Sequence, residues 1–246
     1  MFKTTKALVL REVRYKEADR ILTLLTETDG KLTVKARGAL RKSSRTAAAT
    51  QQLTWAEMTL FFNRGKWTVN EASVLEGFDG LRAGLEALAL GSYFAECLEA
   101  LSVEEQPDAP LLQLGLNALY ALSRGLYEPE KIKAAFELRL MCLSGYAPEL
   151  GHCASCGREP EEPVLNLREG WVCCRACPGG NETLPLGDDA LQALRYIASA
   201  PAKKLFSFTL PPEAQRRLAA ACESYLLAQT ERSFAALSYY KKIRVK

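Results

Sequence analysis

The N-terminal part of the chain decides the fold, and its residues 6–45 read KALVLREVRYKEADRILTLLTETDGKLTVKARGALRKSSR. Short runs rich in Leu, Val and Thr alternate here with turn-forming residues, a pattern that is typical of β-strands. Asp29-Gly30 separates two such runs and readily supplies the positive φ of a tight hairpin. The stretch therefore predicts consecutive strands joined by short turns.

The strand pattern continues beyond this stretch, and Asn63-Arg64-Gly65 marks a second hairpin. Five strands are expected, over residues 6–14, 20–27, 31–38, 53–62 and 67–77. Five strands in so short a segment suit a small barrel. An OB fold is the commonest such barrel with a nucleic-acid role, although other small barrels fit the count equally well.

After Gly80 the apolar residues recur at helical spacings of three, four and seven. Helices are expected over 84–103 and from Pro110 and Pro129, because proline suits the first position of a helix. Two further helices are expected over residues 188–200 and 212–241.

These patterns predict a multidomain protein of the β plus α class. The expected parts are an OB-fold domain (1–80), a helical domain (81–150), an inserted four-cysteine zinc ribbon (151–185) and C-terminal helices that pack on the helical domain (186–246). No apolar run approaches the roughly 18 residues that span a bilayer, so a cytoplasmic protein without a membrane partner is expected.

Composition and charge narrow the function. The chain has 246 residues, of which 48% are hydrophobic and 25% charged, and these fractions exclude a disordered or fibrous protein. Net charge is +5 over residues 1–80, −8 over 81–202 and +6 over 203–246, which together give +3. A basic N-terminal part beside an acidic middle suggests that one part meets a polyanion, although solvated surface charge gives the same pattern.

Two CxxC pairs, Cys153/Cys156 and Cys174/Cys177, are separated by 17 residues, a spacing expected of a zinc site. Two thiolates three residues apart on a tight turn can reach one metal ion at about 2.3 Å, and two such pairs complete a tetrahedron. Residues 163–173 between the pairs read as a β-hairpin, the usual scaffold of a zinc ribbon. One structural Zn²⁺ per chain is predicted.

Alternatives to this ligand set remain open in the sequence. Cys173 precedes Cys174, so either residue can serve as the third ligand, and His152 can replace Cys153 at the expense of the spacing. A redox pair is disfavoured because two CxxC pairs at this separation favour metal. The other cysteines, Cys97, Cys142 and Cys222, lie on apolar helical faces and are expected in the core.

The sequence does not favour an enzyme. Four thiolates fill the coordination sphere and leave no position for substrate or water, so the predicted zinc is structural. His152 is the only histidine, and a nucleophilic triad depends on that one residue. The chain has neither a GxxxxGK[ST] phosphate loop nor the zinc deaminase pattern. No catalytic residue is therefore assigned.

A basic loop follows the third expected strand. Residues 35–45, at the end of this strand and in the loop, carry five cations and two serines. Cations supply the ionic attraction that dominates nucleic-acid affinity, while glycine allows close backbone approach and serines donate to phosphate oxygens. The nearby aromatic residues Trp55, Phe61, Phe62 and Trp67 are interpreted mostly as barrel core, with base stacking as the alternative. The predicted DNA-binding residues are Lys35, Arg37, Arg41, Lys42 and Arg45 in and before the loop, together with Arg14. The alternative is that the loop is a solvated run of surface charge.

Residues 6–45 closely resemble the N-terminal OB domain of the bacterial RecO family of recombination mediators. The resemblance lies in the ALVL strand, the turn 15–19, the hairpin 24–31 and the ARGALRKSSR loop. CASCG (153–157), a glycine-led second knuckle and a closing helical segment agree in order. The second knuckle departs from the family because Cys173-Cys174 replaces a single cysteine, and after Ser224 the match is poor.

The resemblance implies a non-enzymatic protein of DNA repair that binds single- and double-stranded DNA and anneals complementary strands. It also implies that the protein works with the partner RecR and helps replace single-stranded DNA-binding protein (SSB) on DNA with the recombinase RecA. The alternative from another class is a zinc-ribbon enzyme or RNA-processing factor that acts through His152.

Overall fold

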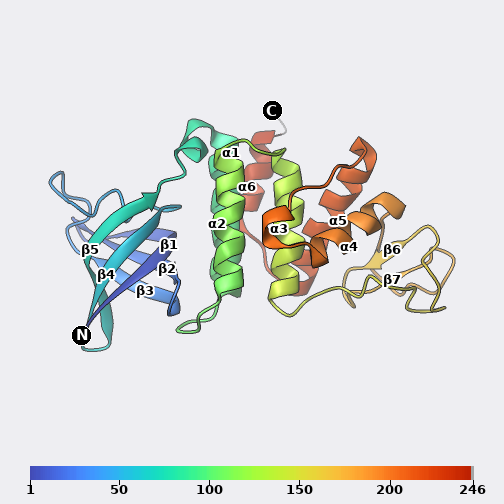
Figure 1. Ribbon diagram of the computed structural model, residues 1–246, viewed down its shortest axis with the longest axis horizontal. Coiled ribbons are helices and arrows are strands. Elements are labelled where there is room, and N and C mark those ends of the chain that lie inside the picture. Colours follow the sequence, from blue (N-terminus) through green and yellow to red (C-terminus); the bar gives the residue numbers. More distant parts are fainter. Residues whose placement is uncertain (245–246) are drawn as a thin grey trace. The chain divides into compact units, whose positions relative to one another are not determined.

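The computed structural model describes residues 1–244, and Figure 1 shows the order of its helices and strands. The chain forms two compact units: a first unit of Met1–Gly125 with Phe234–Lys246, and a second unit of Leu126–Ser233. Residues 245 and 246, which belong to the expected C-terminal part, lie outside the described residues. Every helix within residues 1–244 is too short or too polar to cross a membrane.

Five strands of the first unit form a closed barrel in the order β1-β2-β3-β5-β4. They are β1 (Phe2–Tyr15), β2 (Asp19–Thr26), β3 (Gly30–Ala36), β4 (Trp55–Asn63) and β5 (Lys66–Glu76). Neighbouring strands run antiparallel except β3 and β5, which are parallel. This closure of a five-stranded Greek key is the arrangement of an OB fold, so the predicted strands and barrel are confirmed.

Small aliphatic side chains fill the barrel. In β3, every second residue points inward and is buried: Leu32, Val34 and Ala36. The other strands contribute further Ala, Val, Leu and Met side chains to the same cluster. A core of this size leaves little room for aromatic rings.

The interpretation of the barrel aromatics as mostly core is wrong. Trp55, Phe61 and Trp67 are half-buried, and Phe62 is 39% exposed. Trp67 packs against the core cluster while staying partly exposed, and its ring centroid lies 4.8 Å from that of Phe62. These rings therefore lie at the surface of the barrel.

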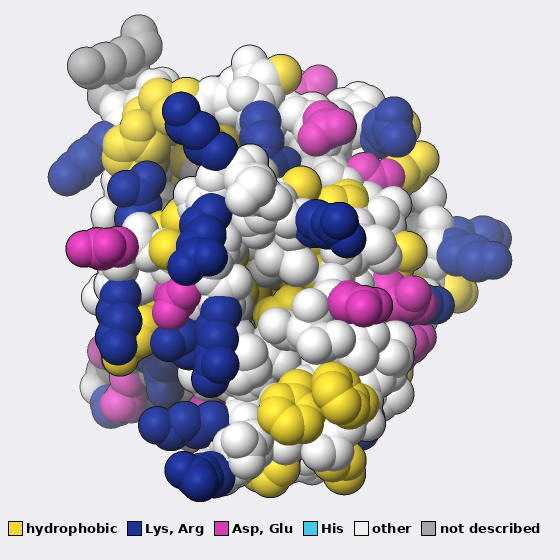
Figure 2. All heavy atoms as spheres, turned by 90° about the vertical axis from the view of Figure 1, so that its left-hand side faces the viewer, with side chains coloured by type: hydrophobic (Ala, Val, Ile, Leu, Met, Phe, Trp, Pro, Cys, Tyr) yellow, Lys and Arg dark blue, Asp and Glu magenta, His cyan; other side chains and the backbone are white. Residues whose placement is uncertain are grey.

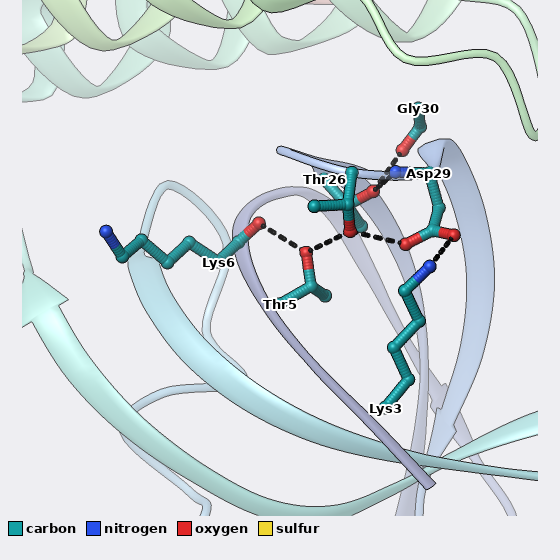
Figure 3. Close-up of polar contacts among 7 residues, drawn as sticks. Lys3, Thr5, Lys6, Thr26, Asp29 and Gly30 are labelled. Atoms are coloured by element: carbon teal, nitrogen blue, oxygen red, sulfur yellow. Dashed lines mark hydrogen bonds and ion pairs between the residues drawn. The ribbon is translucent and has the colours of Figure 1, made fainter. Parts of the chain in front are cut away.

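Polar contacts fix the turn between β2 and β3 (Figure 3). The Thr26 hydroxyl donates to the Gly30 carbonyl and accepts from the Asp29 N–H, both at 2.9 Å. The Asp29 carboxylate accepts from the Thr28 hydroxyl at 2.7 Å and pairs with the ammonium of Lys3 on β1. Burial alone would raise the pKa of Asp29, but these contacts outweigh it and lower the pKa.

Two helices cover one outer face of the barrel, and the segment between them reaches β3. They are α1 (Leu85–Leu101) and α2 (Ala109–Ser123). The Lys31 N–H donates to the Val103 carbonyl at 3.3 Å, and the Glu105 N–H donates to the Lys31 carbonyl at 3.1 Å. The α1–α2 connection therefore runs parallel along the first residues of β3, bridging Lys31 with Glu104.

A single helix over residues 212–241 is a wrong prediction. Helix α5 (Pro212–Thr230) ends at Glu231, whose φ of +49° breaks the helical path, and α6 (Ala235–Arg244) follows. Between them Phe234 is buried, with its ring centroid 5.6 Å from that of Tyr93 on α1. This aromatic contact stabilises the turn between α5 and α6 and the packing of α6 against α1.

The second unit combines helices with a small sheet. Besides α5 it holds α3 (Pro129–Leu143) and α4 (Asp188–Ser199), which confirm the helices expected there. The sheet has the order β7-β6-β8, with β6 (Val164–Asn166), β7 (Val172–Cys173) and β8 (Thr183–Pro185). The pair β6–β7 is the predicted hairpin, and β8 was not expected. The division into four domains stays a prediction.

Gly30 and Gly65 provide a matched test of the contact between β3 and the α1–α2 connection. Both have positive φ, but a Cβ at Gly30 would lie 2.0 Å from the Gln106 carbonyl oxygen, whereas none lies within 4 Å at Gly65. Gly65→Ala should lower the free energy of unfolding by about 1 kcal/mol through backbone strain. Gly30→Ala should lower it by about 1–3 kcal/mol more, because the backbone must move. Urea denaturation measures both, and equal losses would contradict the contact.

Candidate nucleic-acid groove and cysteine cluster

The outward side of β3 carries a row of polar and cationic side chains. Because strand residues alternate between faces, Lys31, Thr33 and Lys35 point away from the buried core residues. Arg37 continues this spacing just after the strand and is exposed. The row therefore places three cations on the outer surface of the barrel.

Lys35 is partly engaged within the protein. Its ammonium lies 2.8 Å from the Asp19 carboxylate and 4.8 Å from the centroid of the Tyr15 ring. The other carboxylate oxygen of Asp19 accepts from the Gly38 N–H at 2.8 Å. Hydrogen bonds from Lys35 and then from Gly38 lower the pKa of Asp19. Asp19 thus ties the β1–β2 turn to the start of the basic loop.

The basic loop is ordered by backbone contacts, and its cations remain free. The Leu40 N–H donates to the Ala18 carbonyl at 2.9 Å, and the Arg20 guanidinium donates to Ala47 and Thr50 at 2.9 and 3.0 Å. Ala39 lies in the barrel core. Four predicted cations are exposed and form no ion pair within residues 1–244: Arg37, Arg41, Lys42 and Arg45.

Figure 2 shows the face of the molecule at the barrel side, where Lys and Arg side chains gather in a band. Only isolated Asp and Glu side chains interrupt this band. Arg14, the remaining predicted DNA-binding residue, is exposed on β1 opposite Arg20, outside the basic loop.

A groove of about 610 Å³ runs along β3. Two of the predicted DNA-binding residues, Lys35 and Arg37, line it. The other charged or aromatic lining residues were either not predicted (Tyr15, Lys31, Lys66, Glu104 and Glu105) or named only in the alternative of base stacking (Trp67). The two-residue spacing of Lys31, Thr33, Lys35 and Arg37 is the signal that indicates a shared outward row, but the parallel pairing of β3 with β5 is needed to bring Lys66 and Trp67 beside it.

The groove lies where β3 is not covered by a neighbouring segment. Residues Val34 and Lys35 pair with β5, while Lys31 is bridged by Glu104 of the α1–α2 connection. Leu32 and Thr33 lie between these pairings and line the groove. One rim is therefore the β4–β5 turn, and the other is the α1–α2 connection.

The second site is a cluster of four thiols in the second unit. The sulfur atoms of Cys153, Cys156, Cys174 and Cys177 all lie within 4.8 Å of one another. The Cys156 and Cys174 sulfurs are 3.9 Å apart. A tetrahedral site with metal–sulfur bonds of about 2.3 Å has edges of about 3.8 Å. The geometry suits a metal ion.

The positions of the two thiols favour Cys174 over Cys173 as a member of this cluster. Cys174 shares the cluster with the other three thiols, whereas the buried Cys173 thiol does not, and burial raises the pKa of Cys173. Burial also opposes ionisation of Cys153, but N–H groups aimed at its sulfur, led by that of Cys174, lower the pKa to about 6. Ionisation is therefore favoured at Cys153 but not throughout the cluster, since burial raises the pKa of Cys177 to about 12.

Side chains from the helices hold the cysteine turns in place. The Arg195 guanidinium of α4 donates to the Leu150 and Gly151 carbonyls at 2.8 and 2.7 Å, and pairs with Glu159 at 2.7 Å. His152, the histidine weighed as a catalytic residue, is exposed next to Cys153 and lies outside the thiol cluster.

Known families match both parts of the chain. The model of the recombination protein O N-terminal domain matches residues 1–78, and that of its C-terminal domain matches residues 82–238. Similar proteins include the DNA repair protein RecO of Acetivibrio thermocellus, 33% identical over 97% of this chain and 96% of that protein. The DNA repair protein RecO of Desulforudis audaxviator is 34% identical over 98% and 97% of the two chains.

The barrel, its grooved basic edge and the thiol cluster define the class of OB-barrel proteins with a helical body and a four-cysteine module. Both family models and the relatives point to one family of DNA repair proteins. The chain belongs to the recombination protein O family, and the resemblance of residues 6–45 is confirmed. No catalytic family is indicated among these matches.

The contact between Lys35 and Asp19 can be tested through the pKa of the Asp19 carboxyl group. The folded-state pKa of Asp19 lies below its usual value of 3.8, so the contact contributes stability above about pH 3.8 and loses it as the pH falls further. Lys35→Met removes the largest cause, and the pKa of Asp19 should rise towards 3.8 in an NMR titration of the carboxyl groups. An unchanged pKa would show that Lys35 does not hold this carboxylate.

Proposed function

We propose that the protein is a non-enzymatic mediator of DNA recombination and repair that binds single- and double-stranded DNA through its barrel. The observation that carries this proposal is the exposed cluster of unpaired cations in residues 37–45, beside a groove lined by further cations and two aromatic rings. Family membership supports the role in DNA repair.

The binding mechanism is charge neutralisation. Lys and Arg side chains release the counterions of a polyphosphate, and this release is favourable for any base sequence. The free cations of the loop hold phosphates, while Lys35, Arg37 and Lys66 continue the contact along the groove. Tyr15 and Trp67 give faces on which bases can stack, an interaction that tolerates every base.

Annealing follows from the same chemistry. Two complementary strands repel each other through their phosphates, and a surface that neutralises several phosphates at once lets them approach. Because the backbone of the loop is already ordered, DNA binding costs little backbone conformational entropy. Strand annealing requires no catalytic residue, in keeping with a protein that is not an enzyme.

The family further suggests the partners of this function. We propose that the protein acts with RecR in the cytoplasm and assists loading of RecA on single-stranded DNA covered by SSB. The body of the chain provides surfaces of different charge from the barrel, since residues 81–202 carry a net charge of −8. Division of labour between a basic DNA-binding part and an acidic part available to proteins supports this arrangement.

We also propose that the four thiols hold one structural Zn²⁺ per chain. Zinc takes four cysteine ligands at tetrahedral geometry, and a filled coordination sphere leaves no site for substrate. The N–H groups aimed at the Cys153 and Cys174 sulfurs satisfy thiolate charge from outside the coordination sphere. The residues present therefore fit a structural zinc site.

Arginine substitutions in the basic loop test the DNA contact. Arg37→Ala or Arg41→Ala should weaken binding to single-stranded DNA similarly for all sequences, and each should reduce the salt dependence by about one ion equivalent. Fluorescence anisotropy titrations at several salt concentrations measure both quantities. Each variant removes one exposed cation that pairs with no carboxylate in residues 1–244.

Lys203→Ala is the matched control, because Lys203 is an exposed cation in the second unit, on the short helix Ala202–Lys204. It should leave the salt dependence unchanged. Wild-type affinity in the combined variant of Arg37, Arg41, Lys42 and Arg45 to Ala would remove the loop from the DNA-binding surface.

Adjacent cysteines provide the test of the metal site. Cys174→Ser should lose the bound zinc measured by mass spectrometry of the purified protein, whereas Cys173→Ser should retain one zinc per chain. Chelation of zinc should lower the Tm of the wild type, because metal binding to a site of this kind contributes to folding. Retention of zinc by Cys174→Ser and its loss from Cys173→Ser would reverse the ligand assignment.

A further inference from the structure

The groove along β3 has two chemically different rims. At the β4–β5 turn it is lined by Gly65, Lys66 and Trp67, and at the α1–α2 connection it is lined by Glu104 and Glu105. Carboxylates repel a polyanion, so the acidic rim does not contribute to the binding of phosphates. The acidic rim is suited instead to a ligand group that donates hydrogen bonds.

The acidic rim is held firmly against β3. The backbone of Glu105 has a φ of +57° and donates its N–H to the Lys31 carbonyl at 3.1 Å. The Lys31 ammonium donates to the Glu99 carbonyl at 3.0 Å, so its first partner is the end of α1. Neither Glu104 nor Glu105 forms an ion pair within residues 1–244, and both are exposed. Their carboxylates are thus available to a ligand in the groove.

The distribution of charge in the groove would orient a bound strand of DNA. Phosphates go to the side where Lys35, Arg37 and Lys66 gather, because ionic attraction dominates backbone contacts. The bases then face the interior of the groove, where the Tyr15 and Trp67 rings allow stacking. The edge of a base stacked there would then face the rim that carries the carboxylates.

We propose that Glu104 and Glu105 give the groove a preference for bases that carry an exocyclic amino group. A carboxylate accepts hydrogen bonds from an amino group such as N4 of cytosine, whereas thymine presents carbonyl O4 at the same position. Facing two acceptors towards each other is unfavourable, so the rim disfavours thymine. This inference rests on the proposed binding of single-stranded DNA and adds a base preference to it.

The test compares homopolymers of cytosine and thymine of equal length. Anisotropy titrations at mildly alkaline pH, where cytosine is unprotonated, should show about fivefold tighter binding of oligo(dC), the lower end of the discrimination given by one good base contact. In the full-length double variant Glu104→Gln, Glu105→Gln, the ratio of the two affinities should approach one. An amide donates as well as accepts, so binding of oligo(dT) should strengthen.

The control is the double variant Glu57→Gln, Glu71→Gln, which removes two exposed carboxylates from β4 and β5, outside the groove lining. It should strengthen both affinities by one common factor and keep the wild-type ratio. If the rim variant behaves in the same way, the carboxylates act only by repulsion and the inference is overturned, while the proposed function stands. Failure of the wild type to bind either oligonucleotide at low salt would overturn both.

Discussion

The structure depends on one constraint: a strand in a closed barrel sends alternate side chains to opposite faces. In β3, Leu32 and Val34 fill the core, so Lys31 and Lys35 must lie outside. A shift of one residue in register would bury the cations and expose the core, and the antiparallel pairing of β2 with β3 makes such a shift costly. The hydrophobic core therefore sets the position of the charges.

The neighbouring elements turn this row of cations into an ordered surface. Asp19 holds both Lys35 and the backbone of Gly38, and Arg20 secures the far end of the basic loop through Ala47 and Thr50. These contacts use the side chains nearest the barrel and leave the outer cations free. A flexible loop of the same composition would lose more conformational entropy on binding DNA. Order in the backbone and freedom in the charged side chains thus coexist in this loop.

Much of this arrangement could be predicted from the sequence. Turn residues such as Asp29-Gly30 and the alternation of apolar residues gave the five strands, and the CxxC spacing gave four thiols that converge in space. Local patterns suffice for these features because they depend on residues close in the chain. The choice between Cys173 and Cys174 could not be made from spacing, since it depends on which of the two side chains at the end of β7 faces the cluster.

Features made by distant residues were beyond sequence reasoning. The groove needs the parallel pairing of β3 with β5 and the approach of residues 103–106, neither of which has a local signal. The break after α5 depends on the contact between Phe234 and Tyr93, which lie far apart in the chain. The surface position of the barrel aromatics depends on the small volume of its core, a property of the closed barrel as a whole.

The central claim is that DNA lies on the outward row of β3 and on the loop that follows it. Hydrogen–deuterium exchange of the full-length protein, with and without single-stranded DNA, tests this claim most directly. Protection on DNA binding should concentrate in peptides that cover residues 30–46 and 63–68. Protection confined to the second unit, with exchange in these peptides unchanged, would contradict the account.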